Sequence, residues 1–172
     1  MRERWYFDFH RSCCLYEGAL KEAIHRFKYL GEFPLLRVFG DLLYPTLQTL
    51  SQDYRVDFLV PVPLHIRRLR ERGFNQALLL ARELSKRTGI PYRARVLRKI
   101  KDTPFQTELK GAQRRKNIKG AFRVERREVI EGKSMVLVDD VYTTGATVNE
   151  CARTLLGAGA ERVAVLTLAM AI

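Results

Sequence analysis

Apolar residues near the start of the chain recur at helical spacing. Between Gly18 and Lys28 they fall at steps of three and four residues, at Ala19, Leu20, Ala23, Ile24 and Phe27. This spacing predicts an amphipathic helix that ends near Gly31. A second helix is predicted from Pro34 to Leu50, because a proline in the first turn loses no hydrogen bond through its missing N–H.

Short apolar runs without helical spacing predict buried strands. Three are predicted at 57–63, 135–138 and 162–172, and two further strands at 95–100 and 121–124. The helices between them are predicted at 76–88, stopped by Gly89 and Pro91, and at 147–156, ended by Gly157 and Gly159.

The order of these elements predicts an open α/β sheet, mostly parallel, with helices on both faces. Residues 57–100 form one expected strand–helix–strand unit and residues 135–172 another, each right-handed and parallel. We expect a single domain over residues 1–172, with a small N-terminal hood at about 1–50 and a core at about 55–172.

Composition places the chain among globular proteins, with 47% hydrophobic and 29% charged residues. No apolar run approaches the roughly 18 to 20 residues of a membrane-spanning helix, and residues 1–10 lack a secretory signal. We therefore expect a cytoplasmic protein without membrane insertion. Three cysteines, Cys13, Cys14 and Cys151, do not suggest a disulfide framework.

Positive charge is concentrated in the middle of the chain. The formal net charge is +12, and residues 93–127 hold 13 Lys or Arg against three acidic residues. Such a segment attracts phosphate groups on a small metabolite or a nucleic acid, or forms a solvated charged loop. Residues 101–119 have no sustained periodicity and are expected to form a long, mobile loop.

The strongest chemical signal is the sequence VLVDDVYTTGAT at 136–147. Asp139 and Asp140 follow an apolar strand, and ligands of open parallel sheets bind at the carboxyl ends of strands. We expect both carboxylates to face that crevice. Sugar hydroxyls and a hydrated Mg²⁺ are their natural partners.

A phosphate cradle is predicted directly after the acidic pair. It offers backbone N–H groups, three hydroxyls and a flexible glycine at the start of a helix, in Thr143, Thr144, Gly145, Ala146 and Thr147. A helix N-terminus carries partial positive charge, which favours phosphate oxygens. A ribose 5-phosphate would span the acids and the cradle.

This stretch resembles the phosphoribosyl pyrophosphate (PRPP) signature of type I phosphoribosyltransferases. Three further stretches, PVPLHIRRLRERGFNQA, TPFQTELKGAQRRKNIKGAF and YEGALKEAIHRFKYLGE, resemble the ComF competence proteins, a branch of that superfamily. The resemblance covers nearly the whole chain. It implies the type I phosphoribosyltransferase fold and PRPP as a substrate that carries Mg²⁺, held in part by Asp139 and Asp140.

The resemblance also assigns roles to basic residues. It places the pyrophosphate-binding loop at 63–72, with candidates His65, Arg67, Arg68 and Arg72; a solvated helix face remains the alternative for the arginines. It places a flexible loop that closes over the substrate at 101–119. The family-like residues there are Gln106, Arg114, Arg115 and Asn117.

One departure from the family concerns zinc. ComF proteins often begin with a zinc-binding segment of two CxxC pairs, whereas here Cys13 and Cys14 are adjacent. With His10 they supply at most three ligands, so we do not expect zinc. Whether a zinc segment precedes this chain in a longer form is left open.

Two functions follow from these features. The first is a Mg²⁺-dependent transferase in which Asp139 and Asp140 hold the ribose and favour the positive charge that develops during transfer. The second is a protein without catalysis that binds PRPP, a nucleotide or single-stranded DNA in competence. A homodimer is possible in either case.

The resemblance implies that the hood, at about 5–50, chooses the acceptor. There Tyr16, Phe27 and Tyr29 either stack on a base or fill a small core, and core packing is favoured because aromatics at helical spacing usually pack.

Overall fold

The computed structural model describes residues 4–103 and 117–171. Its helices are α1 (Gly18–Leu30), α2 (Leu35–Asp53), α3 (Ile66–Arg72), α4 (Gln76–Thr88), α6 (Arg127–Ile130) and α7 (Ala146–Gly157). Its strands are β1 (His10–Leu15), β2 (Phe58–Pro61), β3 (Leu97–Lys99), β4 (Phe122–Val124), β5 (Ser134–Tyr142) and β6 (Arg162–Met170).

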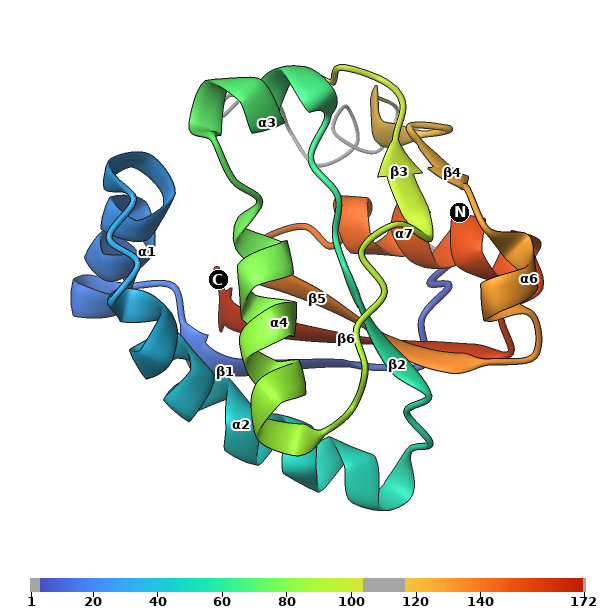
Figure 1. Ribbon diagram of the computed structural model, residues 1–172, viewed down its shortest axis with the longest axis horizontal. Coiled ribbons are helices and arrows are strands. Elements are labelled where there is room, and N and C mark those ends of the chain that lie inside the picture. The colour runs from blue at the N-terminus through green and yellow to red at the C-terminus, as the bar shows by residue number, and fades with distance from the viewer. Residues whose placement is uncertain (1–3, 104–116, 172) are drawn as a thin grey trace.

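A four-stranded parallel sheet forms the centre of the molecule (Figure 1). Its strand order is β1-β6-β5-β2, and all three pairings are parallel. The two long central strands pair from Ser134 with Arg162 to Tyr142 with Met170. The predicted open parallel sheet is confirmed.

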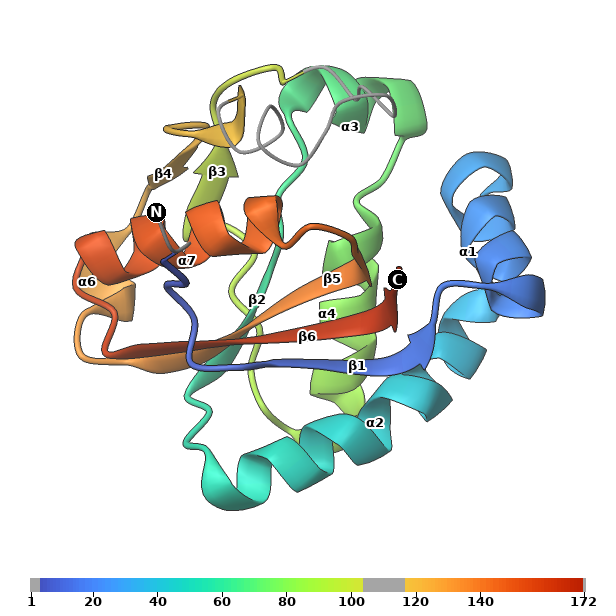
Figure 2. The ribbon, with the colours of Figure 1, turned by 180° about the vertical axis from the view of Figure 1, so that it is seen from behind.

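Side chains of β5 alternate between the two faces of the sheet, as the pleat requires. Met135 and Leu137 pack in the core that α7 covers, while Val136 and Val138 pack in the core under α2 and α4. Figures 1 and 2 show α4 and α7 on opposite faces. The sheet is therefore covered by helices on both faces, as predicted.

Glycine ends two of the predicted helices. Gly31, after α1, and Gly89, after α4, both adopt left-handed backbone conformations, with φ of 65° and 75°. The start of α4 is capped by Asn75, whose side chain accepts the N–H groups of Ala77 and Leu78. Local capping chemistry thus set the bounds of α4 at the predicted residues.

Strand β1 was not predicted from the sequence. It begins with His10, Arg11 and Ser12, so it lacks the apolar alternation that marks a strand. As the edge of the sheet it pairs with β6 alone. Helix α2 packs against both β1 and β6, whereas α1 stands beside the carboxyl ends of the strands (Figure 1).

The expected parallel unit at 57–100 is wrong in its second strand. Strand β3 pairs with β4, antiparallel, in a separate two-stranded sheet. The neighbour of β2 is instead the segment at Tyr92, through a single parallel bridge to Leu59. The carbonyl of Pro91 accepts the N–H of Leu59 and Arg93 donates to the carbonyl of Leu59, but Pro91 has no N–H with which to extend the ladder towards the start of β2.

Within the described ranges, no helix combines the length and the apolar character that crossing a bilayer requires.

Candidate functional site

The acidic pair lies inside the end of β5 rather than after it. Pairing with β6 continues past the apolar run, with Asp139 opposite Thr167, so the strand extends to Tyr142. Side chains of neighbouring strand residues point to opposite faces. The two carboxylates therefore leave different faces of the sheet, which corrects the expectation that both face one crevice.

Asp140 forms an ion pair with Lys28 of α1. Both side chains are buried, at 6% and 14% exposure, and Asp140 Oδ1 also accepts the N–H of Val141 at 2.8 Å. Burial lowers the pKa of Lys28, but the charge of Asp140 outweighs it and the net shift is upward. Lys28 thus stays charged and neutralises Asp140.

Asp139 lies on the other face, towards α7. Its Oδ1 accepts the N–H of Asp140 at 2.9 Å. Burial, and then the charge of Asp140, raise the pKa of Asp139 well above its usual value. Its charge acts on Cys151 of α7 and on Lys99 of β3, a lysine whose own pKa burial lowers. A carboxyl with a raised pKa and an amine with a lowered pKa thus interact electrostatically at this strand end.

The turn between β5 and α7 starts the helix at a glycine. Gly145 is the N-cap of α7 with φ of 72°, and it has no side chain to accept the first N–H groups of the helix. Thr144 Oγ1 accepts the N–H of Ala146 at 3.4 Å, while Thr143 is exposed. Phosphate oxygens are suitable acceptors for the remaining N–H groups.

Trp5 packs close to this turn. A Cβ on Gly145 would lie 2.8 Å from the Trp5 ring and would overlap the Tyr142 hydroxyl. Asn149 of α7 holds the segment in place, accepting the N–H of Tyr6 at 2.7 Å and donating to the carbonyl of Arg4 at 3.1 Å. Only glycine fits at position 145 without displacing these neighbours.

The predicted pyrophosphate loop contains a short helix, α3. His65 is its N-cap, since its Nδ1 accepts the N–H of Arg67, and Gly73 ends it in a left-handed conformation. His65 and Arg67 both approach Asp102, at 3.7 and 3.3 Å. These two residues therefore lie near the start of the basic segment.

Arg68 and Arg72 point elsewhere. Arg68 pairs with Glu71 at 3.1 Å, and Arg72 donates to Gln76 at 2.6 Å with its guanidinium 5.4 Å from the Tyr29 ring centre. His65 and Arg67 thus lie by Asp102, Arg67 and Arg68 share Glu71, and Arg72 lies by Tyr29.

Most of the predicted flexible loop lies outside the described residues, including Gln106, Arg114 and Arg115, while Asn117 is exposed. The described ends of this segment are fixed. Lys101 Nζ donates to the carbonyl of Lys119 at 2.9 Å, and the N–H of Gly120 donates to Glu150 at 2.7 Å.

The N-terminal cysteines lie in β1, where Cys13 donates to Thr46 Oγ1 at 3.4 Å. His10 contacts Thr167 at 2.8 Å, and burial, then Arg11, lower its pKa to about 4. The described residues contain no cluster of three or more His, Cys, Asp or Glu suited to a metal ion. The expectation about zinc stays a prediction.

The hood aromatics take two roles. Phe27 is buried, and its ring centre lies 5.4 Å from that of Phe39 and 5.5 Å from that of Phe74. Core packing is thus confirmed for Phe27. Tyr16 is only partly buried against the same core. Tyr29 is 60% exposed and stands by Arg72.

Sequence reasoning missed two lysines of the site, Lys28 and Lys99. Lys28 follows Ile24 by four residues and Phe27 by one, so it sits at the edge of a buried helix face. A basic residue at such a position was the available signal. Lys99 carried none, because Asp139, whose charge acts on it, is far from it in the sequence.

A parallel sheet with an acidic strand end and a glycine-capped helix start defines a protein of the phosphoribosyltransferase class. Residues 72–171 match the family model of the phosphoribosyl transferase domain. In fold the chain is similar to adenine phosphoribosyltransferase from Saccharomyces cerevisiae, with a TM-score of 0.53 and 14% identity over 81% of this chain and 69% of that one.

Three curated relatives are more similar in sequence. Competence protein F of Haemophilus influenzae is 34% identical over 91% of this chain and 70% of its own length. DNA utilization protein YhgH of Escherichia coli K12 is 40% identical over 87% of this chain and 66% of its own length. Competence protein ComFC of Bacillus subtilis is 32% identical over 87% of this chain and 58% of its own length. The chain thus belongs to the ComF branch of the phosphoribosyltransferase family and spans 58–70% of these relatives' lengths.

Proposed function

We propose that this chain binds PRPP with Mg²⁺ and transfers its ribose 5-phosphate to an acceptor, releasing pyrophosphate. One observation carries the proposal: the acidic end of β5 runs directly into the Gly145-capped start of α7. Carboxylates for sugar hydroxyls and N–H groups for a phosphate are thus five residues apart on one rigid strand–turn–helix unit.

The 5′-phosphate would occupy the turn at 143–147, where helix α7 offers its first N–H groups and Thr144 and Thr147 offer hydroxyls. The ribose hydroxyls would then reach Asp140. Because Lys28 already pairs with Asp140, a bound ribose must share that carboxylate with Lys28 or displace it. Arg67 and His65, which lie by Asp102 beyond the end of β3, would bind the pyrophosphate.

The residues present suit Mg²⁺ held mainly by the substrate. Mg²⁺ is usually bound through one or two carboxylates together with phosphate oxygens and water. Asp140, on the face of the sheet where the ribose would lie, would supply the carboxylate. Bound there, the ion would neutralise charge on the pyrophosphate.

The protein's part in the transfer is positioning and charge stabilisation. Positive charge develops on the ribose as the bond to pyrophosphate breaks, and the Asp140 carboxylate at the end of β5 would stabilise it. Holding the ribose and the acceptor in one geometry removes much of the entropic cost of the reaction.

Calorimetric titration with PRPP and Mg²⁺ tests the proposal. We expect saturable binding by the wild type, and binding at least tenfold weaker in Asp139→Asn with Asp140→Asn. Asp53→Asn, at an exposed position at the end of α2, is the matched control and should bind as the wild type does. Undiminished binding by the double variant would refute the proposal.

A second function is supported by the net charge of +12 and by the names of the relatives, which refer to competence and DNA utilization. We propose that the basic segment also binds single-stranded DNA. Binding of an oligonucleotide should weaken steeply with salt and be lost when Arg114, Arg115 and Lys116 are neutralised together. No gel shift at low salt would exclude this function.

A further inference from the structure

The glycine turn at the start of α7 is enclosed by an aromatic side chain from the beginning of the chain. A Cβ on Gly145 would lie 2.8 Å from a ring carbon of Trp5 and would overlap the Tyr142 hydroxyl. Trp5 nevertheless keeps 41% of its surface exposed. Its ring therefore covers the turn and still borders solvent.

Two hydrogen bonds hold the segment around Trp5 on α7. Asn149 accepts the N–H of Tyr6 at 2.7 Å and donates to the carbonyl of Arg4 at 3.1 Å, so the backbone is tied on either side of Trp5. The N–H of Asn149 in turn donates to the carbonyl of Gly145 at 2.9 Å. Trp5 and the glycine that it covers are thus anchored on the same residue.

Tyr142, the second neighbour of Gly145, is held from β1. Its ring stacks on the His10 ring, with 3.9 Å between the centres and 14° between the planes. His10 Nε2 lies 2.8 Å from Thr167 Oγ1 of β6. Both aromatic neighbours of the turn therefore depend on contacts that the N-terminal segment makes.

A phosphate-binding turn gains from such support. Gly145 has a φ of 72°, and glycine loses more conformational freedom than any other residue when it is fixed. Packing on the turn fixes it before a ligand arrives, and a site that is already ordered binds more tightly. A ring beside the N–H groups also excludes water, which strengthens their hydrogen bonds to phosphate oxygens.

We infer that Trp5 is a positioning residue of the phosphate turn, which holds Gly145 in the conformation that directs the first N–H groups of α7 at a 5′-phosphate. The inference rests on the proposed function, because it takes the turn at 143–147 as the 5′-phosphate site. Trp5 acts on the ribose 5-phosphate half of PRPP alone. The pyrophosphate half has its own proposed cations, His65 and Arg67.

Calorimetry on the whole chain compares the two halves of the substrate, ribose 5-phosphate and pyrophosphate with Mg²⁺. We expect Trp5→Leu to weaken binding of ribose 5-phosphate, and of PRPP, by about tenfold or more, because the turn is no longer held. Pyrophosphate binding should stay unchanged. Unchanged binding of ribose 5-phosphate, or an equal loss for ribose 5-phosphate and pyrophosphate, overturns the inference.

The conservative variant Trp5→Phe keeps an aromatic ring at this position. It should retain most of the affinity for ribose 5-phosphate that Trp5→Leu loses. An equal loss in the two variants would show that ring packing on Gly145 does not hold the turn, and would overturn the inference.

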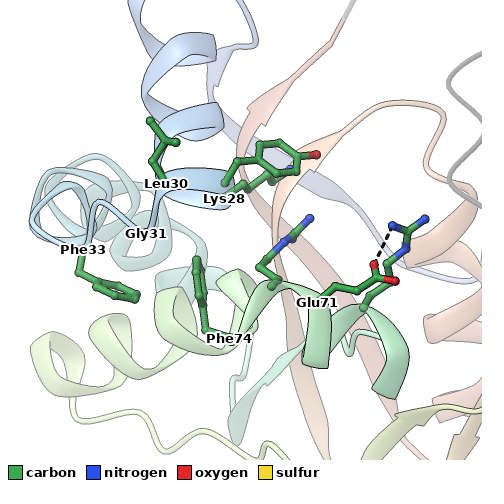
Figure 3. Close-up of a pocket in the computed structure, with 10 residues that line it drawn as sticks. Lys28, Leu30, Gly31, Phe33, Glu71 and Phe74 are labelled. Carbon is green, nitrogen blue, oxygen red and sulfur yellow. Dashed lines mark hydrogen bonds and ion pairs between the residues drawn. The ribbon is translucent and has the colours of Figure 1, made fainter.

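Phe33→Leu is the matched control. Phe33 is 52% exposed and lies in a pocket of about 620 Å³ between the end of α1 and the end of α3, here called the aromatic pocket, which Tyr29 and Phe74 also line. Figure 3 shows Phe33 beside Phe74. Removing this ring should leave ribose 5-phosphate binding as in the wild type, whereas a loss equal to that of Trp5→Leu overturns the inference.

Fluorescence tests the same contact without a variant. Trp5 is the only tryptophan of the chain, so tryptophan emission reports on this position alone. We expect ribose 5-phosphate to shift or quench this emission with the half-saturation concentration found by calorimetry, and pyrophosphate to leave it unchanged. Unchanged emission at saturating ribose 5-phosphate overturns the inference, even if Trp5→Leu does not fold.

The two proposals fail separately. If PRPP binds equally well to the wild type and to Trp5→Leu, the inference is wrong and the proposed function stands. If ribose 5-phosphate binding depends on Trp5 but PRPP with Mg²⁺ does not bind, the proposed function is wrong and the role of Trp5 at the turn stands. A wild type that does not bind ribose 5-phosphate overturns the inference.

Discussion

At the scale of single residues, the ion pair between Lys28 and Asp140 connects α1 to the end of β5. Removing one partner of a buried pair leaves the other charge without compensation, at a cost of about 3 to 5 kcal/mol. We therefore expect Lys28→Met to lower the free energy of unfolding by about 3 kcal/mol, measured by urea denaturation.

The double variant Lys28→Met with Asp140→Asn is the control for that experiment. It removes both charges, so it should recover most of the lost stability. If the two single losses simply add in the double variant, the pair does not interact energetically.

Asp139 should make stability depend on pH. Burial and the charge of Asp140 raise its pKa, so the folded state keeps a proton that the unfolded chain releases above about pH 4. The contribution of Asp139 to the free energy of unfolding is fully present below about pH 4 and is lost as the pH rises through the raised pKa. Asp139→Asn should therefore be more stable than the wild type at pH 7, with the difference vanishing near pH 4.

Urea denaturation of both proteins between pH 4 and pH 8 measures this difference. Asp53→Asn, at an exposed position, should follow the wild type throughout. A variant equal to or less stable than the wild type at pH 7 would show that Asp139 is ionised and favourably placed in the folded protein.

At the scale of elements, helix α7 has a glycine at each end, and the two have different roles. Gly145 has a φ of 72° and neighbours that leave no room for a Cβ, whereas a Cβ on Gly157 would meet nothing within 4 Å. We expect Gly145→Ala to cost about 2 kcal/mol, from the left-handed backbone and the overlap together, and to abolish PRPP binding.

Gly157→Ala is the matched change at the other end. It should be neutral or stabilising by up to about 1 kcal/mol, because alanine loses less entropy in a helix. Thermal unfolding and calorimetry on both variants distinguish these outcomes. Equal effects of the two substitutions would mean that the turn at 145 is not constrained.

Prediction of the elements from sequence succeeded where the local signal was strong. The periodicity of α4, its Asn75 cap and the Gly89 end all act within one segment, and its bounds were predicted correctly. It failed for the second strand of the unit at 57–100: only Tyr92 bridges to β2, and β3 pairs with β4 instead. The residues of a strand do not by themselves determine which strand it pairs with.

At the scale of the whole molecule, β1 makes the N-terminal segment part of the central sheet. Five of its residues pair with β6, and Arg162 of β6 also donates to Asp8 at 2.9 Å. We expect a chain that begins at Glu17 to lose cooperative unfolding, because β6 and the core under α2 would lie open. Far-ultraviolet circular dichroism in urea measures this.

A chain that begins at Arg4 is the control, since it keeps every described contact of β1. It should unfold cooperatively, as the full chain does. Cooperative unfolding of the chain that begins at Glu17 would instead assign residues 4–16 to an independent appendage.

The sequence by itself determined the fold class and the local chemistry of residues 139–147, because hydrophobic period, glycine position and an acidic strand end all act between near neighbours. Only the tertiary structure placed Lys28 against Asp140, sent Asp139 to the other face, and divided the arginines of α3 between Asp102 and the aromatic pocket. These contacts join residues that the sequence separates by tens of positions, and their geometry depends on how α1 and β3 pack against the sheet.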